Sequence, residues 1–151
     1  MSARATQMKA EHLEAVADLW VEYGARSPLN SVLTVDRNTV VRNLSMQLAG
    51  GRSVTLVALE GDTVVGFLHG VVDTWIFCKD KFLTEVALYV KEGYSGGAGA
   101  VLLRAMQGEC RTNGVKLVVA GFYGGVDDQS MEDILTALGY TERGKVMFKE
   151  L

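Results

Sequence analysis

The stretch that decides the fold is Leu88-Tyr89-Val90-Lys91-Glu92-Gly93-Tyr94-Ser95-Gly96-Gly97-Ala98-Gly99-Ala100-Val101-Leu102-Leu103. Its first residues end a run of β-strand formers, its middle is a turn of small residues, and its last residues begin a pattern with helical spacing. Backbone N–H groups at the beginning of a helix have no partner within the helix, and small side chains let an anion approach them. The segment therefore predicts a strand–turn–helix unit that suits a diphosphate, with a plain sharp turn as the alternative.

The segments around this unit alternate between the periods of strands and helices. We expect strands at residues 5–8, 53–59, 63–72, 82–90, 115–120 and 145–149, and helices at residues 13–20, 36–48, 98–112 and 131–138. Gly61 is expected in a tight hairpin turn, and Gly139 just after the end of the last helix. Three successive antiparallel strands followed by a helical crossover form a mixed sheet. The sequence therefore predicts a single domain over residues 1–151, of the α/β class with an α+β mixed sheet.

Composition and charge restrict the class of protein further. With 48% hydrophobic and 22% charged residues, the chain has the composition of a soluble globular domain. Its apolar runs are shorter than the ~18 residues of a membrane span, and its first residues lack the apolar region of a signal peptide. The net charge of −3 argues against nucleic acid as a partner. Because Cys78 and Cys110 lack metal or redox spacing, we expect a cytoplasmic protein with reduced thiols and no metal.

The residues of the turn resemble the GNAT superfamily of acetyltransferases. Residues 94–99 stand where that family carries a pyrophosphate loop written Q/R-x-x-G-x-G/A, and Val65-Gly66-Phe67 is similar to its third strand. Leu138-Gly139-Tyr140, followed by Gly144 and residues 149–151, is similar to the family's chain ending. The resemblance implies the GNAT fold, with the order β-α-α-β-β-β-α-β-α-β, and acetyl-CoA as the cosubstrate.

The resemblance also implies which residues bind acetyl-CoA. The backbone of the fourth strand would pair with the pantetheine arm, and the turn would hold the diphosphate; the residues are Leu88, Tyr89, Val90, Tyr94, Ser95, Gly96, Gly97, Ala98, Gly99, Ala100 and Asp128. Two positions depart from the family pattern. Tyr94 replaces a Gln or Arg, so Lys91 or Arg104 would have to supply a charge near the phosphates. Leu135 replaces a Tyr that protonates the leaving thiolate in many members.

Glu85 is the candidate general base, because it is a lone carboxylate in an apolar strand. A lysine-like amine has a pKa near ~10.4, and it must lose a proton before it can attack a thioester. In some GNAT enzymes a Glu at this point of the fourth strand takes that proton. The alternative is a Glu85 side chain that points to solvent.

His69 and Tyr123 are further catalytic candidates. If the connection over residues 73–81 is symmetric, Val72 pairs with Phe82 and His69 lies opposite Glu85, where the two could form a proton relay. A slip of one residue would place them on opposite faces of the sheet. Tyr123 follows the strand at residues 115–120 and could act as the acid that Leu135 cannot supply. Buried packing roles are the alternative for both side chains.

Two functions follow from these observations. The first is an N-acetyltransferase that moves acetyl from acetyl-CoA to a primary amine, on a small molecule or on a protein Lys or N-terminus, by direct attack in a ternary complex. The second is a non-catalytic CoA-binding or protein-interaction module on the same fold. The departures at Tyr94 and Leu135 favour the second, and the sequence leaves a homodimer open as the assembly.

Overall fold

The computed structural model describes residues 2–94, 97–121, 128–144 and 146–151. The elements, in chain order, are β1 (Arg4–Gln7), the 3-10 helix η1 (Ala10–His12), α1 (Leu13–Arg26), the 3-10 helix η2 (Pro28–Ser31), α2 (Arg37–Leu48), β2 (Ser53–Glu60), β3 (Thr63–Thr74), β4 (Lys81–Val90), α3 (Ala98–Thr112), β5 (Val115–Ala120) and α4 (Asp128–Ala137). The order of strands and helices predicted from the sequence is confirmed from β1 to α4.

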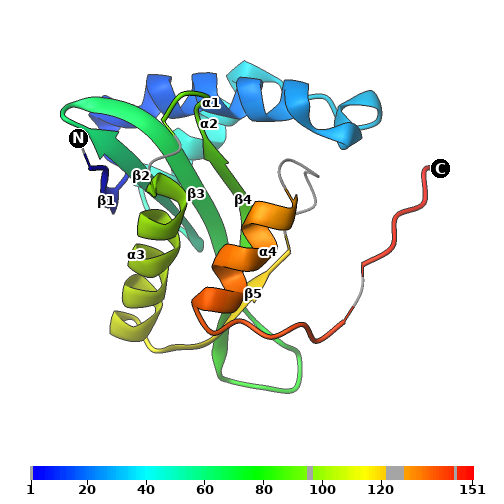
Figure 1. The fold of residues 1–151 in the computed structure, drawn as a ribbon. Helices are drawn as coiled ribbons and strands as arrows, with labels where there is room; N and C mark the ends of the chain where they lie inside the picture. The colour runs from blue at the N-terminus through cyan, green and yellow to red at the C-terminus, as the bar shows by residue number, and fades with distance from the viewer. Residues whose placement is uncertain (1, 95–96, 122–127, 145) are drawn as a thin grey trace.

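The strands form one mixed sheet in the order β1-β2-β3-β4-β5. The first four strands are antiparallel neighbours, and β5 joins β4 in parallel after the crossover through α3. Figure 1 shows α1 and α2 on one face of this sheet and α3 with α4 on the other. The predicted α/β class with a mixed sheet is therefore confirmed.

Both faces of the sheet are buried, which explains why β2 reads as an almost continuous apolar run. On the side of α3 the core includes Leu56, Leu68, Leu83, Leu102, Leu103 and Met106. On the side of α1 it includes Val16, Leu19, Val57, Phe67 and Tyr89. Neighbouring residues of β2, such as Leu56 and Val57, thus belong to opposite cores, as the period of a strand requires.

Glycines end two of the elements as predicted. Glu60 pairs with Thr63, which leaves a two-residue turn in which Gly61 has a φ of 59°. After α4, Gly139 has a φ of 89° and donates its N–H to the Thr136 carbonyl, while Tyr140 donates its N–H to the Leu135 carbonyl. This pair of hydrogen bonds is a Schellman motif, which fixes the direction in which the chain leaves the helix.

The end of the chain differs from the prediction. Residues 146–151 contain no strand, and β5 is the last strand of the described sheet. Figure 1 shows the chain running away from the sheet after α4. Val146 is 60% exposed and Met147 92% exposed. A strand forms by pairing with a neighbour, so alternation in the sequence alone does not produce one.

Candidate active site

The parallel pairing of β4 and β5 ends inside the sheet. It runs from Lys81 opposite Val115 to Glu85 opposite Ala120. Beyond that point β4 continues to Val90 and pairs with β3, whereas β5 has ended. Among the described residues, none pairs with the other edge of β4 over residues 86–90. The two strands thus form a fork, closed at Glu85 and open beyond it. Free N–H and C=O groups of a strand edge can pair with an extended ligand, so the open part of β4 offers backbone groups for binding.

The side chains of Leu88 and Tyr89, in the open part of β4, pack into the cores on the two faces of the sheet. Leu88 is 8% exposed and packs in the core beside α3. Tyr89 packs on the side of α1, where its hydroxyl donates to Glu22 Oε2 at 3.2 Å. What this part of β4 can offer to a ligand is therefore its main chain.

The beginning of α3 lies close in sequence to the fork and has the features of an anion site. Gly97 precedes the helix with a φ of 84°, and the N–H of Val101 is the first to bond within the helix, to the Gly97 carbonyl. The N–H groups of residues 98–100 come before that first bond and have no acceptor in the helix. No acidic residue lies in the first turn of α3. The predicted positions Ser95 and Gly96 lie outside the described residues.

The structure explains a glycine at position 97 but not at position 99. A side chain at Gly97 would meet no atom within 4 Å, but the positive φ of Gly97 is unfavourable for any L residue. A Cβ at Gly99 would lie 3.8 Å from Leu88 Cδ2, an ordinary contact. Gly97 is thus explained by its backbone conformation. The chain itself gives no steric reason for a glycine at position 99.

Tyr94 replaces the charged residue of the resemblance and serves as a packing residue here. Its side chain packs against the core beside α3, and its N–H bonds the Lys91 carbonyl at 3.1 Å. Lys91 and Arg104 both expose their side chains. Because Tyr94 carries no charge, the two cations named above, Lys91 and Arg104, are the exposed side chains that could approach the phosphates.

Glu85 is fully buried at the closed end of the fork, so the alternative of a solvent-facing side chain is wrong. Its Oε1 accepts a hydrogen bond from the Tyr140 hydroxyl at 3.0 Å, while its Oε2 has no hydrogen-bond partner among the described residues. Burial raises the pKa of Glu85 to about 7, and the hydrogen bond from Tyr140 partly offsets that rise. A buried carboxyl group that is half ionised near neutral pH is suited to take up and release a proton.

A β-bulge places Glu85 on the same side of the sheet as Leu88. Gly70 pairs with Glu85, the preceding residue His69 pairs with Ala87, and Val86 is left without a partner on β3. In a regular strand, residues 85 and 88 would lie on opposite faces. The extra residue brings both Glu85 and Leu88 to the side of α3, while Ala87 and Tyr89 face α1.

The register of β3 against β4 makes the predicted Glu85–His69 relay wrong, because Glu85 pairs with Gly70 and not with His69. His69 lies on the side of α1, where its Nδ1 is 2.8 Å from Thr55 Oγ1 and its ring contacts Trp20. Val72 pairs with Leu83 instead of Phe82. Burial lowers the pKa of His69 to about 4, so the ring is neutral at physiological pH. His69 is therefore a buried packing residue whose ring nitrogen is satisfied by Thr55, as the alternative predicted.

The remaining predicted site residues are placed only in part. Tyr123 lies outside the described residues, and Asp128 begins α4 but its side chain is not described. Leu135 packs against the core beside α3, so that position carries no proton donor. The residue that sequence reasoning missed is Tyr140. Its hydrogen bond to Glu85 spans 55 positions of the chain, and the signal for it was the turn at Gly139.

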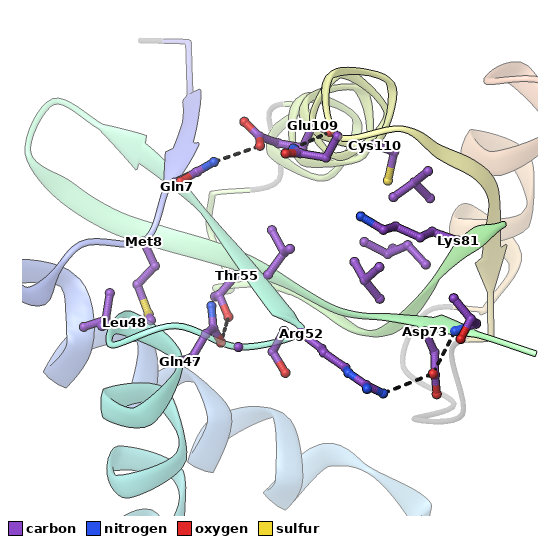
Figure 2. Close-up of a pocket in the computed structure, with 18 residues that line it drawn as sticks. Gln7, Met8, Gln47, Leu48, Arg52, Thr55, Asp73, Lys81, Glu109 and Cys110 are labelled. Atoms are coloured by element: carbon purple, nitrogen blue, oxygen red, sulfur yellow. Dashed lines mark hydrogen bonds and ion pairs between the residues drawn. The ribbon is translucent and has the colours of Figure 1, made fainter. Parts of the chain in front are cut away.

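A large pocket lies away from this fork, at the other end of α3 (Figure 2). It has a volume of about 710 Å³, and its lining includes Glu109, Cys110 and Asn113 from the end of α3. Figure 2 also shows Arg52 paired with Asp73 at its rim, at 3.4 Å. None of the residues that line it belongs to the turn before α3 or to the free edge of β4, and Glu85 does not line it. The pocket is therefore separate from the candidate site.

In the part of the chain that the structure describes, no group of three or more His, Cys, Asp or Glu residues could hold a metal ion. Within the same part, no helix combines the length and the apolar character that crossing a membrane requires.

The forked mixed sheet, with two helices on each face and a glycine turn before the crossover helix, is the GNAT acetyltransferase fold. Solved structures agree over nearly the whole chain. A probable acetyltransferase is 20% identical over 98% of this chain and 96% of its own, with a TM-score of 0.77. The aminoglycoside N-acetyltransferase AAC(6')-Iy, in complex with the bisubstrate analogue CoA-S-monomethyl-acetylneamine, is 15% identical over 100% and 99%, with a TM-score of 0.78.

A third similar structure carries a different kind of name. A transcriptional regulator from Bacillus halodurans C-125 is 13% identical over 99% of this chain and 100% of its own, with a TM-score of 0.79. Neither a protein-family profile nor a curated protein sequence matches the chain. At these identities the structures establish the fold, and function has to be argued from the site.

Proposed function

We propose that this protein is an acetyl-CoA-dependent N-acetyltransferase that acts on a primary amine by direct attack in a ternary complex. The observation that carries the proposal is the fork between β4 and β5, which has the buried carboxyl group of Glu85 at its closed end and a helix N-terminus after its open strand. Similar structures support it, because AAC(6')-Iy was solved with CoA and with a CoA bisubstrate analogue.

The residues of the chain fit the cosubstrate in two places. The N–H groups of residues 98–100 have no acceptor within α3 and can bind the diphosphate, with no acidic side chain in the first turn to oppose it. The free main-chain edge of β4 can pair with the amide groups of the pantetheine arm. Acetyl-CoA supplies the thioester, and the N–H of Leu88 or Val90 can polarise its carbonyl.

Glu85 takes the proton of the amine in this mechanism. The amine nitrogen forms a bond to the carbonyl carbon, the carbon–sulfur bond breaks, and CoA leaves as a thiolate that takes up a proton from solvent. The proton lost by the amine goes to the free Oε2 of Glu85, directly or through a water molecule. Because the pKa of Glu85 is about 7, the group is ionised in a useful fraction of molecules at neutral pH.

A non-catalytic acyl-CoA-binding module is the second candidate. Leu135 packs in the core where many GNAT enzymes carry a Tyr, so the described residues offer no acid there for the thiolate. A transcriptional regulator also shares the fold. This candidate predicts tight binding of acetyl-CoA without transfer to any amine.

The test combines binding with turnover. CoA release from acetyl-CoA is followed with a thiol reagent over a panel of primary amines, and calorimetry gives the affinity for acetyl-CoA. Glu85→Gln should lose at least about 100-fold in turnover near neutral pH, keep its affinity for acetyl-CoA, and recover partly at high pH where more amine is neutral. Glu60→Gln, at the end of β2, is the matched control and should behave as wild type. Full activity of Glu85→Gln at neutral pH would exclude Glu85 as the base.

A further inference from the structure

We propose that Tyr140 is a positioning residue for the general base: its hydroxyl occupies Oε1 of Glu85 and leaves Oε2 as the oxygen that accepts the proton of the amine. This inference rests on the proposed function and goes beyond it, because neither the resemblance nor the similar structures assign Tyr140 a role. The geometry that carries it is the 3.0 Å hydrogen bond to a carboxyl group whose second oxygen is buried and unpaired.

The backbone holds the phenol in place. Tyr140 is the residue directly after Gly139, and the Schellman motif fixes its N–H to the Leu135 carbonyl at 3.0 Å. The positive φ of Gly139 sets the angle at which the chain leaves α4. The hydroxyl therefore reaches Glu85 from a rigid turn, as a group that positions a base should.

In the described part of the chain, no hydrogen bond or ion pair joins Glu85 to a charged side chain. Its neighbours in the sheet are Gly70 on β3 and Ala120 on β5, neither of which has an ionisable side chain. On α3, Cys110 interacts electrostatically with Glu85, and burial raises the pKa of Cys110 to about 11, so that the thiol is neutral. Among the described residues, the phenol of Tyr140 is the group that hydrogen-bonds Glu85 and lowers its pKa.

Loss of this hydrogen bond should change the proton affinity of Glu85 in one direction. The phenol donates to the carboxylate and so stabilises the charged form, against the effect of burial. Without the donor, burial acts alone and the pKa of Glu85 rises. The base would then be protonated, and inactive, up to a higher pH than in wild type.

The first experiment is a pH–rate profile. Tyr140→Phe keeps the ring and removes the donor. The acid limb of kcat/KM should move up by about one pH unit, a tenfold loss of rate on that limb, while the rate at high pH approaches that of wild type. KM for acetyl-CoA should stay unchanged. Tyr23→Phe is the matched control, since Tyr23 is a half-buried tyrosine on the side of α1. The same amine in all variants cancels the titration of the acceptor.

The second experiment does not depend on turnover. The carboxyl group of Glu85 is titrated by carbon-13 NMR in labelled intact protein, with Glu85→Gln to assign the signal. Tyr140→Phe should raise the pKa of Glu85, and Tyr23→Phe should leave it unchanged. If Tyr140→Phe fails to fold, Gly139→Ala is titrated instead: it keeps the hydroxyl but strains the turn, and it should raise the pKa in the same direction.

The outcomes separate the two proposals. A raised pKa together with a shifted acid limb supports the positioning role of Tyr140. An unchanged pKa in Tyr140→Phe, or in Gly139→Ala where that variant replaces it, overturns that role even if the enzyme is active. A raised pKa in a protein that transfers acetyl to no amine leaves the hydrogen bond as described and refutes the proposed enzymatic function, and with it Tyr140 as an aid to catalysis.

Discussion

The burial of Glu85 predicts that the protein becomes less stable as the pH rises towards neutrality. The pKa of Glu85 is raised from 4.5 to about 7 by burial. Below pH 4.5 the carboxyl group is protonated in the folded and in the unfolded chain, so it contributes no difference. Above pH 7 it is ionised in both, and the folded chain carries the cost of a buried charge. Each pKa unit corresponds to about 1.4 kcal/mol, so the full cost is about 3 kcal/mol.

The assay is urea unfolding of wild type and Glu85→Gln at a series of pH values between 4 and 8. The free energy of unfolding of the variant, relative to wild type, should rise by about 3 kcal/mol across this range. His69 works in the opposite direction, since its lowered pKa favours unfolding as the pH falls. His69 is present in both proteins, so its effect cancels in the difference. Cys110 titrates above this range because its pKa is raised to about 11.

A difference between the two proteins that stays constant with pH would refute the reasoning. It would mean that Glu85 keeps an ordinary pKa, and that the unpaired Oε2 is in contact with water in solution. The result does not depend on any enzymatic activity, so it tests the electrostatics of the fork by themselves.

Two further predictions concern the cosubstrate and the second base candidate. Gly99→Val should weaken the binding of acetyl-CoA at least tenfold, or about 1.4 kcal/mol. A side chain at position 99 meets little of the protein and would project at the N-terminus of α3, where the diphosphate is proposed to bind. Calorimetry measures the affinity, and Gly108→Val in the same helix is the control for helix propensity. Equal affinity in both variants would contradict the anion site. His69→Gln should leave the acid limb of the pH–rate profile where it is in wild type, because His69 bonds Thr55 on the other face of the sheet. A moved limb would show that His69 communicates with the reacting amine.

The sequence predicted the elements well because their signals are local. Gly61 ends one strand with a positive φ, and Gly139 ends α4 in the same way. A run of small residues predicts the turn before α3, and Gly97 in that run adopts a left-handed conformation. Each of these features depends on a few adjacent residues, so a pattern read along the chain suffices to locate them.

The geometry of the candidate site depends on features that no local pattern contains. The bulge at Val86 changes the face of every later residue in β4, and nothing in the run Phe82 to Val90 marks it. The expected register, with Val72 opposite Phe82, placed His69 opposite Glu85, whereas Val72 pairs with Leu83 and Gly70 with Glu85. The contact between Tyr140 and Glu85 joins segments that only the packing of α4 brings together. Glu85 itself was found because a charged residue inside an apolar strand is rare enough to need a reason.

The bulge and the buried carboxyl group belong to one arrangement. Without the extra residue Val86, the side chains of residues 85 and 88 would point to opposite faces, and Glu85 could not share a face with Leu88. The bulge interrupts the β3–β4 ladder, and the burial of Glu85 makes the folded chain less stable at neutral pH. A leucine at position 85 would remove the second cost and continue the apolar side chains of Leu83 and Leu88 on the side of α3. Glu85 thus keeps one hydrogen-bonded and one unpaired oxygen beside the point where the sheet opens, although this lowers the free energy of unfolding. Catalytic groups commonly lower the stability of a protein in this way.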